Sequence, residues 1–525
     1  MEVIEGLFVT IGSNVCWINL THRYVAQIDE EKKQITIVKN RQNVYSVPQV
    51  ASFTALFGIN GSGKTQLLLE LAESCSGYNG CKMGILLSRE GNQPQLYKGK
   101  VLKSWSSNVE LTRPPTKIDT IFYSSSPFDM VRRRSYLNKK NVIDTSPRFN
   151  HNMQYDIVFV METMGWLKHN IAAYKNIELS IQNSIPDVYT SIENILSLLV
   201  TMSSKAMDVR RRDFKTKLRY LFQRLKEDAD AESVINARLY IAKLTNLLPE
   251  NPLRNKFIEE LSALLMSKPE IDTLHFYSFI KIMALDSGTK LSLENVGPIL
   301  KGVVSLKTRN KVIIPEVNLL PFVNALNDFE KDVLREMVEE DVLRYEFTKI
   351  SSGEIALLQL FLSIGAELKN HTEHDNSPIM IMIDEGEMFL HPAWQKKYIA
   401  QLLAFCQNKN NIAHRIHLFV STHSLIVAAD SPPFCLFDMN KGHNINGFGL
   451  GPKSILYDVY NAGEFSGEYS ASLFNKIMRY IRIAEEIKPE EIKPEEIMEA
   501  RTLIDSLADD TLKATLKRKV FGKES

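Results

Sequence analysis

The sequence lacks the features of exported and membrane-spanning proteins. Its first residues carry neither the basic nor the apolar region of a signal peptide, and the longest clean apolar stretch, 355–366, is too short to span a bilayer. No C-x-x-C pair occurs among the cysteines, so neither a zinc site nor a disulfide framework is indicated. We therefore expect a cytoplasmic protein with no membrane partner. Its reduced, mostly buried thiols would be Cys16, Cys75, Cys81, Cys406 and Cys435.

The chain also lacks a dominant charge and a long coiled coil. Its 63 basic and 62 acidic residues leave a net charge of +1, which argues neither for nor against a nucleic-acid partner. Local basic clusters at 132–140 and 210–219 leave direct nucleic-acid binding open, with solvated helix faces as the alternative. No heptad pattern is sustained, because prolines interrupt the helical segments. At 525 residues, with 44% hydrophobic and 24% charged, the chain exceeds one ordinary globular domain.

A glycine-rich loop is the most informative stretch that is present. It follows the apolar run 53–57, which predicts a strand, and precedes the helix-like run 65–72. In this context the pattern G-x-x-x-x-G-K-[ST] surrounds phosphate oxygens with backbone N–H groups and a helix N-terminus, and its last residues reach the outer phosphates and Mg²⁺. The sequence thus predicts a nucleoside triphosphate site. Its residues are Gly58, Asn60, Gly61, Ser62, Gly63, Lys64, Thr65 and Gln66.

Two carboxylates end a second apolar run, at 377–385. A continuous apolar run suits a central parallel strand covered on both faces, with its last residues at the ligand-binding edge. Asp384 is the predicted Mg²⁺ ligand beside Thr65, and Glu385 is predicted to polarise the attacking water. An apolar strand that ends in Asp-Glu is common, so this prediction depends on the phosphate loop elsewhere in the chain.

Two further stretches lie before and after this strand. The first consists of Ser351, Ser352, Gly353 and Glu354. It precedes the apolar run 355–368 and predicts a capping box, with Ser351 as N-cap and Glu354 three residues later; a capped helix N-terminus is also an anion site. The second is the apolar run 416–421, a predicted buried strand that delivers His423 to its end. There an imidazole would contact the terminal phosphate, and a turn histidine without such a role is the alternative.

The pattern changes along the chain. Short alternating runs before residue 57 predict an antiparallel β subdomain. Apolar residues at three- and four-residue spacing predict a compact helical insertion, with helices at 188–202, 214–226, 233–247 and 253–266. We expect an α/β fold with a mainly parallel core sheet. The expected divisions are a first core part with the phosphate loop, the helical insertion, a second core part and a helical tail, at 1–150, 151–340, 341–460 and 461–525.

The order of these motifs resembles that of ABC-type ATPases: the phosphate loop, residues 351–354, the Asp-Glu strand and His423. Within that family, the chain is similar to the soluble branch, which contains the structural-maintenance-of-chromosomes proteins, the RecF-like repair ATPases and the overcoming-lysogenization-defect proteins. The resemblance implies an ABC-ATPase head that binds ATP and Mg²⁺ and hydrolyses ATP. It also implies that residues 351–354 of one copy complete the nucleotide site of another, in a homodimer or a higher even-numbered oligomer. Two residues depart from the family's pattern: Ser352 stands where the family has glycine, and Glu354 stands where it has glutamine. Residues 124–127 stand where the glutamine loop is expected, without a glutamine.

The run from Asp384 to Gln395 narrows the resemblance. It is similar to the Asp-Glu-Pro-Glu…Leu-His-Pro…Trp-Gln stretch of overcoming-lysogenization-defect-like and Septu-type ATPases of bacterial anti-phage systems, with Gly386 in place of the proline. The sequence shows neither the acidic cluster of a topoisomerase-primase nuclease after His423 nor a His-Asn-His arrangement. A Septu ATPase subunit is the form it most resembles. That implies an anti-phage subunit controlling a separate His-Asn-His (HNH) endonuclease, with a retron reverse transcriptase and its RNA and DNA as a further implied partner.

Two other classes of function stay open. One is a DNA-repair or chromosome-associated ATPase of the RecF-like or zinc-hook kind. The missing long coiled coil and C-x-x-C hook argue against the zinc-hook kind, and the Trp-Gln stretch favours the anti-phage group. The other is a scaffold that senses ATP without hydrolysing it.

Overall fold

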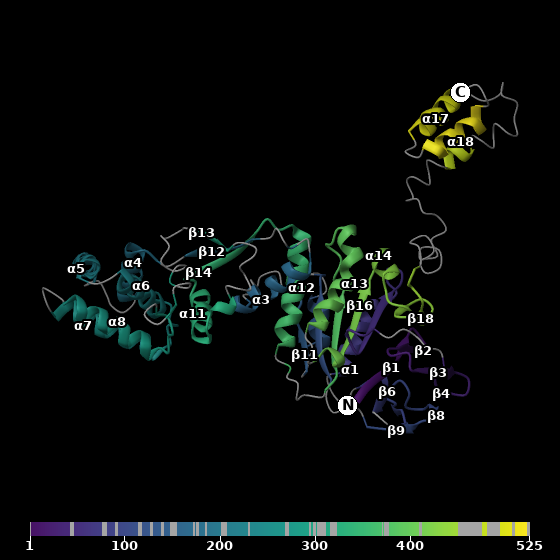
Figure 1. Cartoon of the computed structure of the whole chain (residues 1–525), viewed down its shortest axis with the longest axis horizontal. Helices are drawn as coiled ribbons and strands as arrows, with labels where there is room; N and C mark the ends of the chain where they lie inside the picture. Colours follow the sequence, from purple (N-terminus) through teal and green to yellow (C-terminus); the bar gives the residue numbers. More distant parts are fainter. Residues whose placement is uncertain are drawn as a thin grey trace.

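A seven-stranded sheet forms the centre of the protein in a computed structural model of the chain (Figure 1). Its strands are β5 (Ser52–Phe57), β10 (Asp119–Ser124), β11 (Val142–Asp144), β15 (Ile379–Asp384), β16 (Ile416–Thr422), β17 (Leu436–Asp438) and β18 (His443–Ile445). The spatial order is β11-β10-β15-β16-β5-β17-β18, and every neighbouring pair is parallel except β17 with β18. The structure therefore confirms an α/β chain with a mainly parallel core sheet.

The structure describes most of the chain, with gaps. The described residues are 2–41, 47–75, 81–89, 93–113, 118–126, 130–137, 141–147, 155–171, 174, 178–183, 186–200, 207–228, 231–267, 272–292, 296–297, 301, 311–314, 323–369, 371, 377–408, 412–449, 475–479, 494–506 and 510–521.

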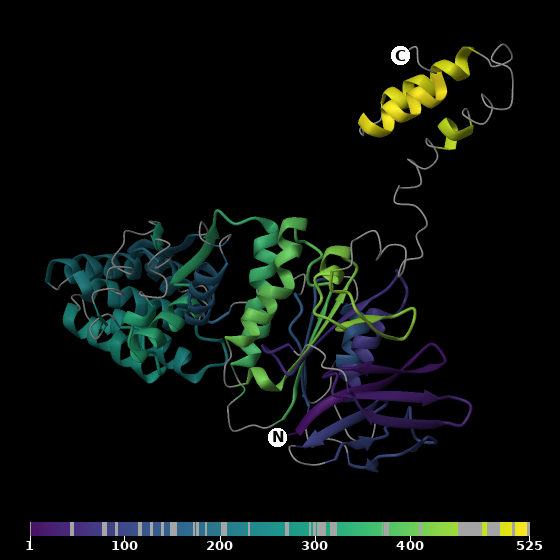
Figure 2. The same cartoon turned by 45° about the vertical axis from the view of Figure 1, so that its right-hand side comes forward.

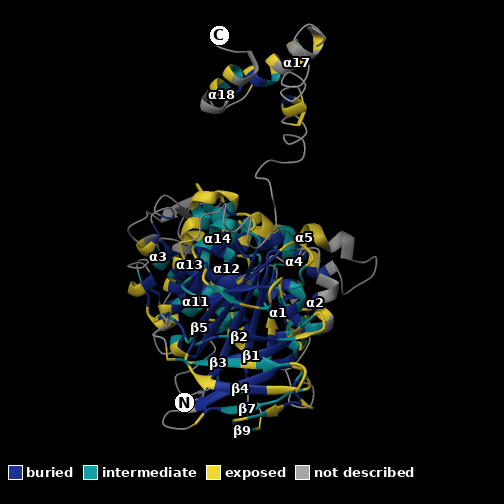
Figure 3. Ribbon diagram, turned by 90° about the vertical axis from the view of Figure 1, so that its right-hand side faces the viewer, coloured by how far each residue is buried: buried dark blue, intermediate teal, exposed yellow. Residues whose placement is uncertain are grey.

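Helices cover the central sheet on both faces, which explains the continuous apolar runs of its strands. Successive residues of a strand point to opposite faces. The isoleucines of β15 accordingly join one core with α12 (Ser352–Leu368) and α13 (Pro392–Gln407), whereas its methionines join a second core with α1 (Lys64–Cys75). In Figure 3 the strands form the buried interior between these layers.

The N-terminal part forms two smaller sheets. The first contains β1 (Glu2–Ile11), β2 (Asn14–Asn19), β6 (Gly84–Arg89), β7 (Gln95–Tyr97) and β9 (Glu110–Leu111); the second contains β3 (Tyr24–Asp29), β4 (Gln34–Lys39) and β8 (Ser106–Ser107). Phe8, Trp17 and Trp105 belong to a core between them. The pairs β1–β2 and β3–β4 are antiparallel, as the alternating runs predict, and β1 also pairs with β6 in the antiparallel direction.

A separate helical unit lies on the side of the central sheet that is opposite the two N-terminal sheets (Figures 1 and 2). It consists of α4 (Val188–Val200), α5 (Met207–Asp228), α6 (Ala231–Thr245), α7 (Pro252–Ser267) and α8 (Thr273–Asp286). These helices bury a core of their own. The four helices predicted from apolar spacing are confirmed, with bounds shifted by up to seven residues.

A three-stranded sheet leads into and out of this unit. Its strands β12 (Glu178–Asn183), β13 (Lys311–Ile314) and β14 (Leu343–Thr348) lie in the order β13-β12-β14, with antiparallel pairs. Two nearby helices, α3 (Ile157–Asn170) and α11 (Asp328–Glu339), join the large core beside α12 rather than the core of the helical unit. The domain boundaries that the sequence predicts at residues 150, 340 and 460 stay predictions.

The remaining helices are short. α2 (Met130–Leu137) packs beside α1, α14 (Leu425–Ala429) follows β16, and a 3-10 turn, η4 (Ala413–Arg415), precedes β16. α17 (Pro494–Asp505) and α18 (Asp510–Phe521) contact each other, and much of the expected tail between β18 and α17 lies outside the described residues.

All five cysteines are buried and unbridged, as predicted. Among the described helices, none has the length and apolar character needed to cross a membrane.

Candidate functional site

The phosphate loop connects β5 to α1 at the carboxyl edge of the central sheet. Gly61 and Gly63 have φ angles of +80° and +88°, the left-handed region that glycine adopts without steric penalty. At Gly58, a Cβ atom would lie 2.8 Å from Ser62 Oγ and 2.9 Å from Met439 Cβ, so the loop closes only around a glycine. The predicted order of strand, loop and helix is confirmed.

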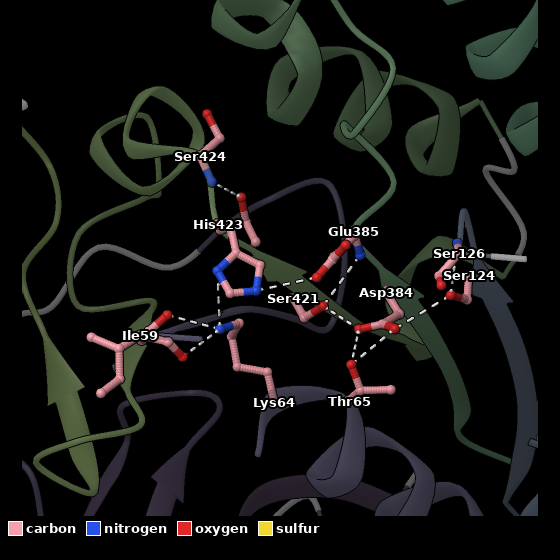
Figure 4. Close-up of polar contacts among 12 residues, drawn as sticks. Ile59, Lys64, Thr65, Ser124, Ser126, Asp384, Glu385, Ser421, His423 and Ser424 are labelled. Atoms are coloured by element: carbon pink, nitrogen blue, oxygen red, sulfur yellow. Dashed lines mark hydrogen bonds and ion pairs between the residues drawn. The ribbon is translucent and has the colours of Figure 1, made fainter. Parts of the chain in front are cut away.

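The Lys64 side chain is buried and turns back towards its own loop. Its ammonium donates hydrogen bonds to Gly58 O at 2.8 Å and Ile59 O at 3.2 Å, and it lies 3.4 Å from His423 Nδ1 (Figure 4). Burial lowers the pKa of Lys64 to about 8, and the carboxylates at 384–387 act in the opposite direction. A buried amine held mainly by carbonyl groups has the charge and position needed to bind a phosphate.

The Thr65 hydroxyl meets the Asp384 carboxylate across 319 residues of sequence. Thr65 Oγ1 lies 3.0 Å from Oδ1 and 3.1 Å from Oδ2 of Asp384. Ser421 donates to the first oxygen, and Ser124 donates to the second at 3.3 Å (Figure 4). Burial raises the pKa of Asp384, and these hydroxyl groups act against the increase. The two residues predicted to hold Mg²⁺ therefore lie together.

Glu385 leaves the line of β15 through an unusual backbone turn. Its φ is +51°, which is uncommon for a residue other than glycine, and its N–H donates to Ser421 O at 3.2 Å. The carboxylate faces His423, whose Nε2 lies 3.2 Å from Oε1 (Figure 4). The hydrogen bond from His423 lowers the pKa of Glu385, with burial acting in the opposite direction. The lowered pKa favours the ionised form of Glu385, which is the form that accepts a proton.

Residues 351–354 begin α12 and form the predicted capping box. Glu354 N donates to Ser351 Oγ at 3.3 Å, and Ser351 N donates to Glu354 Oε2 at 2.6 Å. Gly353 lies against the loop after β15, because a Cβ atom there would be 3.0 Å from Phe389 O. Within the described ranges, no hydrogen bond or ion pair joins 351–354, Ser352 included, to the phosphate loop. In the described part of one chain, this stretch therefore makes no hydrogen bond to Lys64, Thr65, Asp384, Glu385 or His423.

The loop fits a phosphate-bearing ligand. Ser62 Oγ is buried and has no hydrogen-bond partner among the described residues. Asn60 is exposed at the tip of the loop, next to the open space around Gly61. Gln66 differs from these residues, because its amide already donates to Glu70 at 2.5 Å and to Tyr136 at 3.1 Å. The oxygen atoms of Thr65 and of its Asp384 partner are the ligand type that Mg²⁺ prefers.

Sequence reasoning missed the two serines that hold Asp384. Ser124 ends β10 and Ser421 lies near the end of β16, and both are in register with Asp384 on the strand between them. The available signal was that neighbouring parallel strands bring their carboxyl ends together. Ser124 also belongs to the stretch 124–127, where the resemblance implies a glutamine, so a serine contacts Asp384 from this position.

The turn after Glu385 is tightly packed. At Gly386, a Cβ atom would lie 2.2 Å from Tyr398 Oη and 2.6 Å from Ile383 Cγ2, so this chain has no room for the proline of the similar ATPases. Glu387 follows and is 3% exposed. Thr422 donates to Glu387 Oε1, while Oε2 has no partner in the described part of the chain. Burial raises the pKa of Glu387 to about 7.

Several described residues of the two basic clusters are buried or paired within the chain. Arg133 is fully buried, with its guanidinium 3.6 Å from Asp144, so it is not available to nucleic acid and that part of the hypothesis is wrong. In the second cluster, Arg211 and Lys215 both pair with Glu193. The side chains of Arg132, Lys139, Lys140 and Arg210 lie outside the described residues.

Comparison of the chain with protein-family models and with curated proteins finds no match.

Proposed function

We propose that this protein binds ATP with Mg²⁺ and hydrolyses it as an ABC-type ATPase head. The observation that carries the proposal is the cluster of Lys64, Thr65, Asp384, Glu385 and His423 at the carboxyl edge of a parallel sheet. Three distant parts of the chain supply a phosphate-binding amine, oxygen ligands for Mg²⁺ and an ionised base. This set of groups matches the parts that phosphoryl transfer to water requires.

In the proposed mechanism, each side chain has a separate task. The loop N–H groups and Lys64 bind the outer phosphates. Thr65 and Asp384 would hold Mg²⁺, which would neutralise phosphate charge when bound. Glu385 accepts a proton from the attacking water. His423 donates to Glu385 and so fixes the orientation of the carboxylate that performs this step.

We also propose that ATP brings two copies together. Residues 351–354 offer a helix N-terminus and a serine, both suited to phosphate, and within the described part of their own chain they make no hydrogen bond to the cluster. Apolar side chains are exposed in the phosphate loop, in α12 and in the loop after Glu385: Ile59, Ile355, Met388 and Phe389. Exposed apolar groups around a site support association there. A second copy would complete the site through residues 351–354.

Two substitutions test the ATPase proposal. Glu385→Gln should retain ATP affinity and lose at least about 100-fold in turnover, because a general base contributes roughly 10²–10⁴-fold. Lys64→Ala should lose ATP affinity, because it removes the buried cation. Calorimetric titration with ATP and phosphate-release kinetics measure the two effects. Glu339→Gln, at an exposed position on α11, is the matched control and should change neither.

Full turnover in Glu385→Gln, or unchanged ATP affinity in Lys64→Ala, would contradict the assignment. ATP binding by the unaltered protein without turnover, alone and with its partner, would instead favour the non-hydrolysing scaffold.

The wider proposal is a cytoplasmic anti-phage ATPase subunit that controls a separate HNH endonuclease, with a retron reverse transcriptase as a further partner. Its support is the motif resemblance, in particular the stretch that ends at Trp394 and Gln395. Here the structure adds a contact: Ser424, next to His423, donates to Gln395 Oε1 at 2.7 Å. Co-purification with the product of the neighbouring reading frame tests the proposal. A nuclease whose activity ignores both ATP and Glu385→Gln would contradict it.

A further inference from the structure

A groove of about 430 Å³ lies between α3 and α13, away from the cluster around Lys64. Figure 3 shows these two helices on the same side of the sheet. Alanines of α13, such as Ala400, leave space along the helix, and the indoles of Trp166 and Trp394 also line the groove. The volume is within the range of sites for small organic ligands.

Both indoles are held in place by the core behind them. Trp166 makes an edge contact with Phe405, with ring centroids 5.6 Å apart and planes at 73°. Trp394 makes a similar contact with Tyr174, at 5.7 Å and 88°. Each contact fixes the orientation of one indole, so the groove has preorganised aromatic walls.

The groove also contains polar groups with unused capacity. Gln401 is 7% exposed, and its Oε1 has no hydrogen-bond partner among the described residues. Lys397 is exposed at the groove and forms no ion pair with any residue that the structure describes. Asn170 donates to Trp166 O at 2.8 Å through Nδ2, which leaves Oδ1 as an acceptor. A buried amide oxygen without a partner is costly, so a ligand edge that donates to Gln401 Oε1 would be favoured.

We propose that this groove binds a nucleobase that carries a phosphate, from either a free nucleotide or a single-stranded nucleic acid. The indoles offer stacking surfaces, the Gln401 and Asn170 amides suit the polar edge of a base, and Lys397 suits the phosphate. A purely apolar side chain of a protein partner would leave the Gln401 amide unpaired and Lys397 without an anion. The polar groups therefore favour a base over an apolar peptide.

The groove is connected to the proposed ATPase site by two contacts. Tyr174, which touches Trp394, donates to Glu354 O at 2.9 Å at the start of α12. The neighbour of Trp394, Gln395, accepts the hydrogen bond from Ser424. A ligand on Trp394 would thus act on both the α12 N-terminus and the segment that holds His423. This regulatory part rests on the proposed ATPase function, whereas binding in the groove does not.

Quenching of tryptophan fluorescence tests the binding, because two of the four tryptophans line the groove. The full chain with Lys64→Ala is used, so that the phosphate loop does not contribute. The probes are AMP, GMP, CMP, UMP and a 12-nucleotide single-stranded DNA of mixed sequence. Lys397→Glu and Ala400→Glu should each weaken binding by about tenfold or more, because they place a carboxylate in the groove. Lys396→Glu changes the adjacent exposed lysine, which does not line the groove, and should have little effect.

Saturable quenching by a mononucleotide supports a free nucleotide, and quenching by the oligonucleotide alone supports a single strand. The absence of saturable quenching by every probe would overturn the proposal. An equal loss of affinity in Lys396→Glu and Lys397→Glu would overturn it too, since binding would then reflect general surface charge. The proposal would also be overturned if a partner protein bound in the groove and none of the probes did. ATP affinity in the chain with Lys64 intact remains a separate test of the ATPase proposal.

Discussion

Two adjacent carboxylates at the end of β15 have pKa shifts of opposite sign. Asp384 is buried, and desolvation raises its pKa even though three hydroxyl groups donate to it. Glu385 is only half buried, and the hydrogen bond from His423 lowers its pKa. The difference comes from the turn at Glu385, which takes its side chain out of the sheet. When the surroundings of two neighbouring carboxylates shift their pKa values in opposite directions, one carboxylate can serve as a metal ligand and the other as a base.

Glu387 gives a prediction about pH. Its pKa is raised from 4.5 to about 7 by burial, so the folded protein binds more protons than the unfolded chain between these values. Its contribution to stability is therefore greatest below about pH 4.5 and is lost as the pH rises to about 7. Glu387→Gln should remove this dependence, a relative gain of up to about 3 kcal/mol at pH 8. Urea denaturation of both proteins at pH 5 and pH 8 measures it.

The exposed Glu339→Gln serves again as the control and should leave the pH profile of the unfolding free energy unchanged. Parallel profiles for the unaltered protein and Glu387→Gln would contradict the prediction, because Glu387 would then have the same pKa in both states.

The sequence alone predicts the main residues of the site but not what holds them. Lys64 and Thr65 belong to a motif with a defined local geometry, so their position follows from the strand and helix around them. Ser421 and Ser124 contact Asp384 only because β16 and β10 are the two neighbours of β15. Strand order depends on the packing of the whole sheet, and no local pattern encodes it.

At the scale of elements, the turn between β15 and α13 is fixed by close packing. Gly386→Ala should destabilise the protein by about 1–3 kcal/mol, the usual cost of overpacking, because the new methyl group would meet Tyr398 Oη. Tyr398→Phe removes that oxygen and should restore part of the loss. A double-mutant cycle from denaturation midpoints measures the coupling between the two positions.

Additive effects in that cycle would show that the Tyr398 hydroxyl is not the atom that excludes a side chain at Gly386. Complete restoration is not expected, because Ile383 Cγ2 also lies 2.6 Å from the position of the added atom.

Most elements follow from periodicity, whereas their packing partners do not. Four helices of the separate unit, α4 to α7, and the antiparallel N-terminal strands are read from apolar spacing, whereas α8 is not. The position of α3 is different. It lies in the stretch expected to be the insertion, yet it packs into the core beside α12. An apolar helix face indicates that the helix is buried, but it does not identify the surface that covers it.

At the scale of the whole molecule, the proposed association of two copies gives a further prediction. Phe389 is 55% exposed in the loop after Glu385. In the Glu385→Gln background, Phe389→Glu should prevent the ATP-dependent dimer while leaving ATP affinity within about twofold, because it places a charge in the proposed interface and not at the phosphate loop. Light scattering with and without ATP measures the mass.

Leu274→Glu is the matched control, since Leu274 is 62% exposed on α8 in the helical unit and should not affect the dimer. An ATP-dependent dimer that persists in Phe389→Glu would place the interface elsewhere.

The antiparallel pair of β12 and β14 has a mechanical consequence. The chain enters the helical unit after β12 and leaves it before β13, and β14 then pairs with β12, with Asn183 opposite Leu343. Only three residues separate the end of β14 from α12, whose N-cap is Ser351. A slip of this ribbon by one residue, about 3.3 Å, would carry Ser351 with it. In the proposed dimer, a movement of the helical unit that shifts this ribbon would therefore change how far Ser351 reaches towards the facing nucleotide.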